Sequence, residues 1–213
     1  MSPSGCLHSR RSFLKAGAVL ASGLSSLAFS PEPAAAQANA WNIGPQPGYS
    51  PEIGTLVSML AYTRRQVLQN VKGLSQQDLD FLLDGKANTI GALLLHLAAT
   101  ETYYGLNTFG GFKWGSWPDD IKKKWDVPMN LGVPAQKAIK GNSLDYYLTI
   151  LEESRNKNLA EFRKRDDPWL AQVDAQGANN YAKWFHVAEH ESNHDGQIKF
   201  LKRRLPGAPP GGE

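Results

Sequence analysis

Residues 180–205 read NYAKWFHVAEHESNHDGQIKFLKRRL, and the spacing of their side chains predicts one long amphipathic helix. At about 100° per residue, the apolar side chains fall on one stripe, and His190 and His194 lie on that stripe. His186 falls at its edge. A Pro-Gly pair follows at once, which is a helix stop signal. We therefore expect this helix to turn two histidines toward a core and to leave the third at the margin.

Three other segments show the same helical period. Each begins with a proline or a Thr/Ser cap and ends near glycine or Asp-Pro, as helices do; they are residues 51–74, 90–109 and 143–165. A shorter helical piece is expected after Ser75. No strand-like alternation of any length and no internal repeat interrupts this pattern. The sequence therefore predicts an all-α fold, a four-helix bundle over residues 51–205.

The longest connection, residues 112–142, is rich in Trp, Pro and Gly. Its composition predicts an irregular segment with one short helix around residues 119–125. Loops of this length are uncommon in compact domains unless they cover something. We expect this segment to cover either a functional site or an edge of the core.

The N-terminus has the order of an export signal. Residues 9–15 read SRRSFLK, and an alanine-rich run ends AQA at Ala38. Between them lies a mild apolar stretch of about 14 residues, which is too short to span a bilayer comfortably. The twin arginines followed by Phe-Leu-Lys resemble a twin-arginine (Tat) signal peptide; a chance amphipathic N-terminus is the alternative. We expect the Tat machinery to export residues 39–213, folded, as a periplasmic or secreted protein, with cleavage after Ala38 or, alternatively, Ala40. Residues 39–50 are then an extended arm, and residues 206–213 a disordered tail.

Composition excludes several classes of function. With 41% hydrophobic and 20% charged residues the chain has the makings of a globular core. The net charge of +3 falls to +1 without residues 1–38, which hold three cations and one acid, so no nucleic-acid partner is expected. The single cysteine, Cys6, also lies in that leader. Cysteine nucleophiles, iron–sulfur clusters and thiolate zinc sites are therefore excluded in the processed chain.

Histidines carry the chemistry that remains. His190 and His194 are four residues apart, so they stand on one helix face and can hold one metal ion. His96 lies between Leu93 and Leu97 on the apolar stripe of its own helix. Burying three imidazoles without polar partners is costly, and one metal ion would satisfy all three. The alternative is that each is a core histidine hydrogen-bonded to a neighbour.

Three motifs resemble one family. Residues 190–198, HESNHDGQI, resemble the H-x-x-x-H-x-G-Q-I signature of the DinB-like (YfiT-like) superfamily. Residues 89–101, TIGALLLHLAATE, are similar to that family's second helix, in which a ligand histidine lies five residues before an acidic residue, here His96 and Glu101. Residues 71–80, VKGLSQQDLD, look like the sequel to its first helix. The resemblance covers roughly residues 50–205.

The resemblance implies an up-up-down-down four-helix bundle with one divalent metal. By position its ligands are three histidines: His96, His190 and His194. Zinc is favoured, with nickel, iron and manganese as alternatives, because imidazole suits several of these metals and the ligand type alone does not choose between them. Members with an assigned activity include transferases and isomerases that use low-molecular-weight thiols. The export signal is a departure, since such thiols are usually cytoplasmic, and it argues against a thiol transferase.

A competing motif is H-E-x-x-H, the zincin protease pattern, formed by residues 190–194 with Glu191 as general base. No histidine follows His194 to serve as a third ligand, and Gly196 comes two residues after it rather than three. The zincin reading therefore ranks below the bundle. Within the bundle, Glu191 could still approach a metal-bound water.

Two hypotheses about function remain from sequence. The first is a metal-dependent transferase or hydrolase acting on a small-molecule substrate, because three ligands leave coordination positions open. The second is a non-catalytic metal-binding or interaction bundle, and a homodimer is compatible with both. No catalytic residue is assigned. Four polar residues are candidates to orient the imidazoles, with a solvated helix face as the alternative: Glu101, Asn193, Asp195 and Gln197.

Overall fold

The computed structural model describes residues 42–209, which form eight α-helices and no strand within that range. The helices are α1 (Pro51–Val71), α2 (Gln76–Asp80), α3 (Ile90–Thr108), α4 (Asp119–Asn130), α5 (Gly132–Ala138), α6 (Leu144–Phe162), α7 (Asp167–Ala171) and α8 (Asn180–Lys202). The predicted all-α fold is therefore confirmed. The expected signal peptide, its cleavage site and the end of the expected tail lie outside the described residues.

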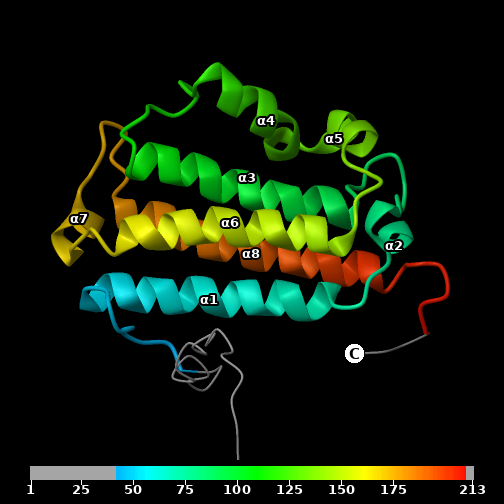
Figure 1. The fold of residues 1–213 in the computed structure, drawn as a ribbon, viewed down its shortest axis with the longest axis horizontal. Helices are drawn as coiled ribbons and strands as arrows, with labels where there is room; N and C mark the ends of the chain where they lie inside the picture. The colour runs from blue at the N-terminus through cyan, green and yellow to red at the C-terminus, as the bar shows by residue number, and fades with distance from the viewer. Residues whose placement is uncertain (1–41, 210–213) are drawn as a thin grey trace, which may run out of the picture. The chain divides into compact units, whose positions relative to one another are not determined.

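The four long helices α1, α3, α6 and α8 form the bundle (Figure 1). α8 packs against both α1 and α3, and α3 packs against α6. Around the bundle the order is α1, α8, α3, α6, with the first two parallel and the next two running the other way (Figure 1). Along the chain the four helices therefore run up, down, down, up (Figure 1), which corrects the expected up-up-down-down order: the segment that holds α4 and α5 carries the chain back, so α6 starts at the same end as α3. This arrangement sets α3 and α8 antiparallel and side by side.

The expectation for residues 112–142 was wrong in part. Instead of one short helix around residues 119–125, the segment contains α4 and α5, and a further short helix, α7, follows α6. In α4, Ile121, Trp125 and Met129 are spaced four residues apart and pack on the larger hydrophobic cluster, so the expected helix ended one turn too early. Pro128 also argues against a helix, because it has no N–H to donate, yet α4 continues through it to Asn130. α4 lies over α3 and covers it (Figure 1).

This cover explains why α3 is enclosed. Its partners α6, α8 and α4 surround it, and most of its side chains are buried, His96 among them. Two hydrophobic clusters complete the interior: a larger one around α3, and a second one around the fully buried Trp184 and Phe162. Polar groups on the inner face of α3 are therefore held in a water-poor region.

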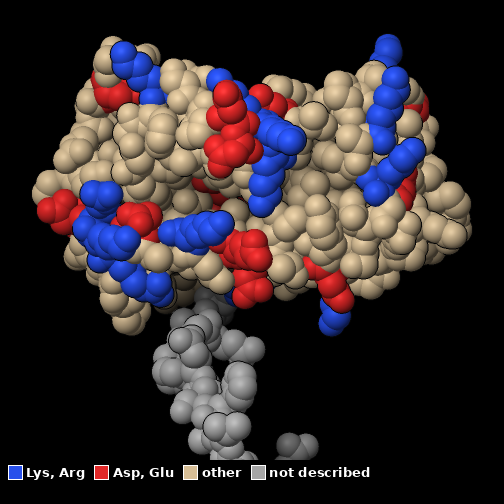
Figure 2. Space-filling view, turned by 45° about the horizontal axis from the view of Figure 1, so that its top comes forward, with Lys and Arg blue, Asp and Glu red and all other residues tan. Residues whose placement is uncertain are grey.

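The outer surface carries charges of both signs. On the face shown in Figure 2, basic and acidic side chains are interspersed rather than gathered by sign. None of the helices in the described part of the chain combines the length and apolarity needed to cross a bilayer.

Candidate metal centre

The three histidines predicted as ligands converge at the contact between α3 and α8. Nε2 of His190 lies 3.1 Å from Nε2 of His96 and 3.1 Å from Nε2 of His194. The ligand atoms of all three lie within 4.8 Å of one another. His96 and His194 are buried, at 6% and 8% exposure, whereas His190 is half-buried. The cluster therefore has its more accessible side at His190.

The spacing of these nitrogens fits a shared divalent cation. Zinc–imidazole bonds are about 2.0–2.1 Å long. Two nitrogen atoms bound to one zinc ion are therefore about 2.9 Å apart when the N–Zn–N angle is about 90° and about 3.4 Å apart when it is tetrahedral. The two distances of 3.1 Å lie between these limits. A three-histidine group of this geometry could hold one divalent metal with positions left open.

Hydrogen bonds on the far side of two rings direct their lone pairs inward. Nδ1 of His96 donates to the Pro128 carbonyl oxygen at 3.0 Å, and Nδ1 of His194 donates to Oε1 of Gln197 at 3.2 Å. A proton on Nδ1 leaves Nε2 as an acceptor. Nδ1 of His190 is buried with no hydrogen-bond partner among the described residues. At most one proton, on His190, is then available to three converging nitrogens, and a cation would satisfy them all.

The protonation states favour metal binding as well. Burial, with a smaller contribution from the charge that His194 carries when protonated, lowers the pKa of His96 to about 4 and that of His190 to about 3. Burial also lowers the pKa of His194. These imidazoles are therefore neutral at pH 7, and their lone pairs are available without first losing a proton.

His186 does not join the cluster. Its side chain is exposed, and Nδ1 lies 3.2 Å from a carboxylate oxygen of Glu189. Its ring centroid is 5.6 Å from that of His190 and 5.8 Å from that of Tyr104. The periodicity argument that put His190 and His194 inside and His186 at the edge is confirmed.

Of the four residues expected to orient the imidazoles, only Gln197 does so in the structure. Gln197 contacts His194, as expected. Asp195 instead accepts from Asn70 at 2.7 Å and pairs with Lys199 at 2.6 Å, and Asn193 bonds to Glu189. Glu101 does not orient an imidazole in this structure either. The main partner of His96 is a backbone carbonyl, which side-chain reasoning could not identify.

Glu101 belongs to a buried ionic quartet with Arg64, Arg155 and Glu191, one residue from each of the four bundle helices. Arg64 Nη2 lies 2.5 Å from Glu101, and its Nε bonds to Glu191. Arg155 Nη2 lies 2.7 Å from Glu101 and 2.9 Å from Glu191. The side chains are at most 10% exposed. Two cations and two anions thus balance inside the bundle.

Further hydrogen bonds complete this quartet. Arg64 donates to the Leu151 carbonyl and Arg155 to the Leu60 carbonyl, at 3.0 and 2.7 Å. Burial raises the pKa of Glu101, but the charges of Arg155 and Arg64 outweigh it and hold that pKa below its usual value. Sequence reasoning missed the two arginines, although both occupy positions on apolar helix stripes. An arginine on an apolar stripe indicates a buried ion pair, and this signal was available in the sequence.

The quartet bears directly on the zincin alternative. Glu191 is 2% exposed, and its carboxylate oxygens bond to Arg64, Arg155 and Thr63. A general base needs a carboxylate free to take a proton from a metal-bound water. The contacts of Glu191 are those of a structural ion pair, so neither a zincin base nor a water-activating role is supported for it.

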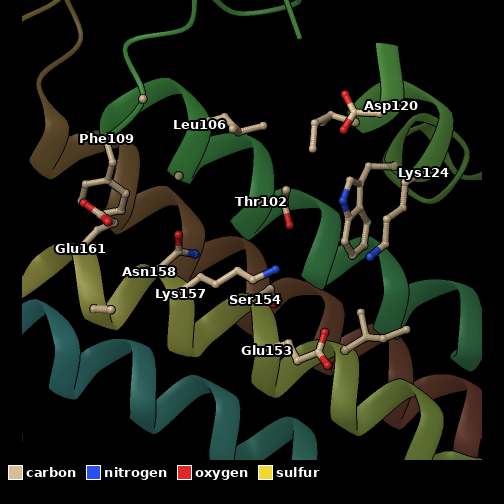
Figure 3. A pocket seen from close by; sticks show the side chains of 16 residues that line it. Thr102, Leu106, Phe109, Asp120, Lys124, Glu153, Ser154, Lys157, Asn158 and Glu161 are labelled. Carbon is tan, nitrogen blue, oxygen red and sulfur yellow. The ribbon is translucent and has the colours of Figure 1, made fainter. Parts of the chain in front are cut away.

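A separate cavity of about 800 Å³ lies between α3, α4 and α6 (Figure 3). Its lining combines apolar side chains, such as Leu106 and Ile150, with both basic and acidic ones, such as Lys157 and Glu153. None of the three clustered histidines lines it. It is therefore distinct from the candidate metal centre.

Comparison with known proteins places the chain. A crystal structure of a conserved protein from Enterococcus faecalis has the same fold, with a TM-score of 0.54 and 10% sequence identity over 70% of this chain and 93% of that one. No curated protein matches the chain. The family model described as mycothiol-S-transferase matches residues 55–207, which include α3, α6, α8, most of α1 and all three histidines. The chain therefore belongs to the mycothiol-S-transferase family, a DinB-like family.

Proposed function

We propose that this protein is a divalent-metal-dependent S-transferase that joins a low-molecular-weight thiol to a small electrophilic substrate. The single observation that carries the proposal is the convergence of three neutral Nε2 atoms within a chain that matches the mycothiol-S-transferase family. His96, His190 and His194 are the proposed ligands, and zinc the proposed metal. A cation held there would lower the pKa of a bound thiol and so supply a thiolate at neutral pH.

The residues of the chain then have defined tasks. His96 and His194 are held by Pro128 and Gln197, so their lone pairs need no reorganisation when the metal binds. The half-buried His190 marks the side from which thiol and electrophile enter. In the reaction, the thiol sulfur loses its proton and forms a bond to an electrophilic carbon, and the leaving group departs with its electron pair.

His186 is the exposed imidazole nearest to that side, and we assign it the thiol proton. Its ring lies beside His190 without entering the cluster. An imidazole at this place can accept the proton while the three ligands stay bound to the metal. Replacement of His186 should therefore lower turnover and leave the metal content unchanged.

We also propose that the protein acts outside the cytoplasm, on the basis of the twin-arginine signal in residues 1–38. Export by the Tat route delivers proteins that are already folded, which suits a bundle with a preassembled metal site. The thiol co-substrate must then be present in the same compartment. This requirement makes the identity of the thiol the main question for experiment.

The test measures conjugation of a thiol to an electrophile, first with and without zinc and then with different thiols. Protein starting at Asn39 is stripped with a chelator, reloaded with zinc, and assayed with 1-chloro-2,4-dinitrobenzene and mycothiol, glutathione or cysteine. We expect a product that requires both zinc and one of the thiols and that is lost in His194→Ala. A protein that binds one zinc ion but conjugates none of these thiols would support the non-catalytic metal-binding alternative instead.

A further inference from the structure

The end of α4 has an unusual backbone. Leu131, which separates α4 from α5, has φ 55° and ψ −151°. This region is essentially restricted to glycine, because a side chain there strains the backbone. Leu131 is the only non-glycine residue with positive φ in the described part of the chain. Strain of this kind persists only where the surroundings impose it.

The unusual turn changes where two backbone groups find partners. If the helix continued, the Gly132 N–H would donate to the Pro128 carbonyl, four residues earlier. Instead the Gly132 N–H donates to Oδ1 of Asn88 at 3.0 Å. The last regular bond of α4 runs from Leu131 N to the Val127 carbonyl at 3.1 Å. The Pro128 carbonyl is thereby free to accept from Nδ1 of His96 at 3.0 Å.

Other contacts hold this turn against the start of α3. Asn88 directly precedes Thr89, the N-cap of α3, so its position is fixed relative to the helix that carries His96. In α5, Nε2 of Gln136 donates to the Ala87 carbonyl at 2.7 Å. The Leu131 side chain packs against the larger hydrophobic cluster. The segment before α3 and the beginning of α5 are therefore fastened together.

We propose that Asn88 and Leu131 are positioning residues for the metal centre: by diverting the Gly132 N–H, they keep the Pro128 carbonyl on Nδ1 of His96. The His96 proton then stays on Nδ1, and the lone pair of Nε2 stays directed at the other two histidines. This inference rests on the proposed function only in taking His96 as a ligand of the metal. Asn88 and Leu131 touch neither metal nor substrate.

The main test is Asn88→Ala in the protein starting at Asn39. Without the Asn88 oxygen, the Gly132 N–H can bond to the Pro128 carbonyl and compete with His96. Loss of the group that orients a metal-binding histidine weakens affinity by about 10–100-fold, and we expect roughly tenfold weaker zinc binding in competition with a chromophoric chelator. Asn88→Asp keeps an acceptor oxygen and should bind zinc like the wild type. Asn107→Ala, which removes a comparable bond to the Phe112 carbonyl, is the matched control and should leave zinc affinity unchanged.

The histidine tautomer gives a readout that does not need the metal. In metal-free protein, long-range ¹H–¹⁵N spectra should show His96 protonated on Nδ1, and Asn88→Ala should shift part of the population to Nε2–H. If zinc fails to bind to the wild type, the proposed function fails, while this measurement still tests the positioning. An unchanged tautomer together with unchanged zinc affinity in Asn88→Ala would overturn the inference, as would equal losses in the Ala and Asp variants.

The turn itself is tested by Leu131→Gly and Leu131→Ala. Both remove the packed side chain, but only glycine adopts the observed φ without strain. We expect the glycine variant to melt at the higher temperature and to keep wild-type zinc affinity. The opposite order of melting temperatures would show that Leu131 does not hold the positive-φ conformation in solution, and the inference would fail.

Discussion

The buried quartet makes a sharp prediction for Glu191→Gln. The wild-type quartet holds two arginines and two glutamates at no more than 10% side-chain exposure. Glutamine keeps the shape of Glu191 but removes its charge, so Arg64 and Arg155 would share Glu101 alone. Removing one partner from a buried ionic pair costs about 3–5 kcal/mol, because the remaining charge cannot recover its hydration.

This cost can be converted into a melting temperature. For a domain of about 150–250 residues, 1 kcal/mol corresponds to about 2–4 °C, so Glu191→Gln should melt about 6–20 °C below the wild type. Thermal and urea unfolding, followed by circular dichroism, would measure it. Elemental analysis should still find one zinc ion per chain, because Glu191 is not a ligand.

Two comparisons make the result interpretable. Glu189→Gln changes an exposed residue of the same helix and should stay within about 0.5 kcal/mol of the wild type. Adding Arg155→Gln to Glu191→Gln restores neutrality, so the double variant should lose less stability than the sum of the two single variants, by about 0.5–3 kcal/mol. A Glu191→Gln protein that melts within 2 °C (about 0.5–1 kcal/mol) of the wild type would refute the ionic quartet. Loss of a peptidase activity at unchanged stability would revive the zincin alternative.

Three further predictions concern the metal, pH and export. Alanine at His96, His190 or His194 should remove most of the bound zinc and lower the melting temperature, since a metal ion bound to the folded state adds to its stability. His186→Ala should keep one zinc per chain. Zinc retained after His194→Ala would refute this ligand set. The pKa of His96 is about 4 in the folded protein and about 6.5 in the unfolded chain, so the unfolded chain takes up this proton first as the pH falls. The free energy of unfolding of the metal-free protein should therefore drop by roughly 3 kcal/mol through this one residue between about pH 6.5 and pH 4. Urea unfolding at each pH would measure it. Bound zinc should nevertheless remain at pH 5.5 in dialysis against metal-free buffer, and release already at pH 6 would contradict the lowered pKa. Finally, replacing Arg10 and Arg11 with lysine should leave precursor in the cytoplasm, and processed protein still found outside by cell fractionation would refute twin-arginine export.

The local sequence was sufficient to identify the long helices and the inward face of α8. A helix repeats every 3.6 residues whatever surrounds it, so the register of His190 and His194 against the apolar stripe follows from residues 180–205 alone. The same reasoning placed His96 on the buried side of α3. Caps such as Thr89 and Ser143, whose side chains accept from the backbone in the structure, fixed the helix starts for the same local reason.

Tertiary structure alone decided which buried groups meet. Periodicity tells which face of a helix is inside but not which residue of another helix lies opposite, so the pairing of Arg64 with Glu191, 127 positions away, could not be read from either helix. The cover of α3 by α4 was hidden because the apolar spacing of Ile121, Trp125 and Met129 shows that α4 has an inner face but not which helix that face covers. The Pro128 carbonyl on His96 was hidden for a deeper reason. Every residue has a carbonyl, and only the path of the backbone at Leu131 determines that this one faces an imidazole.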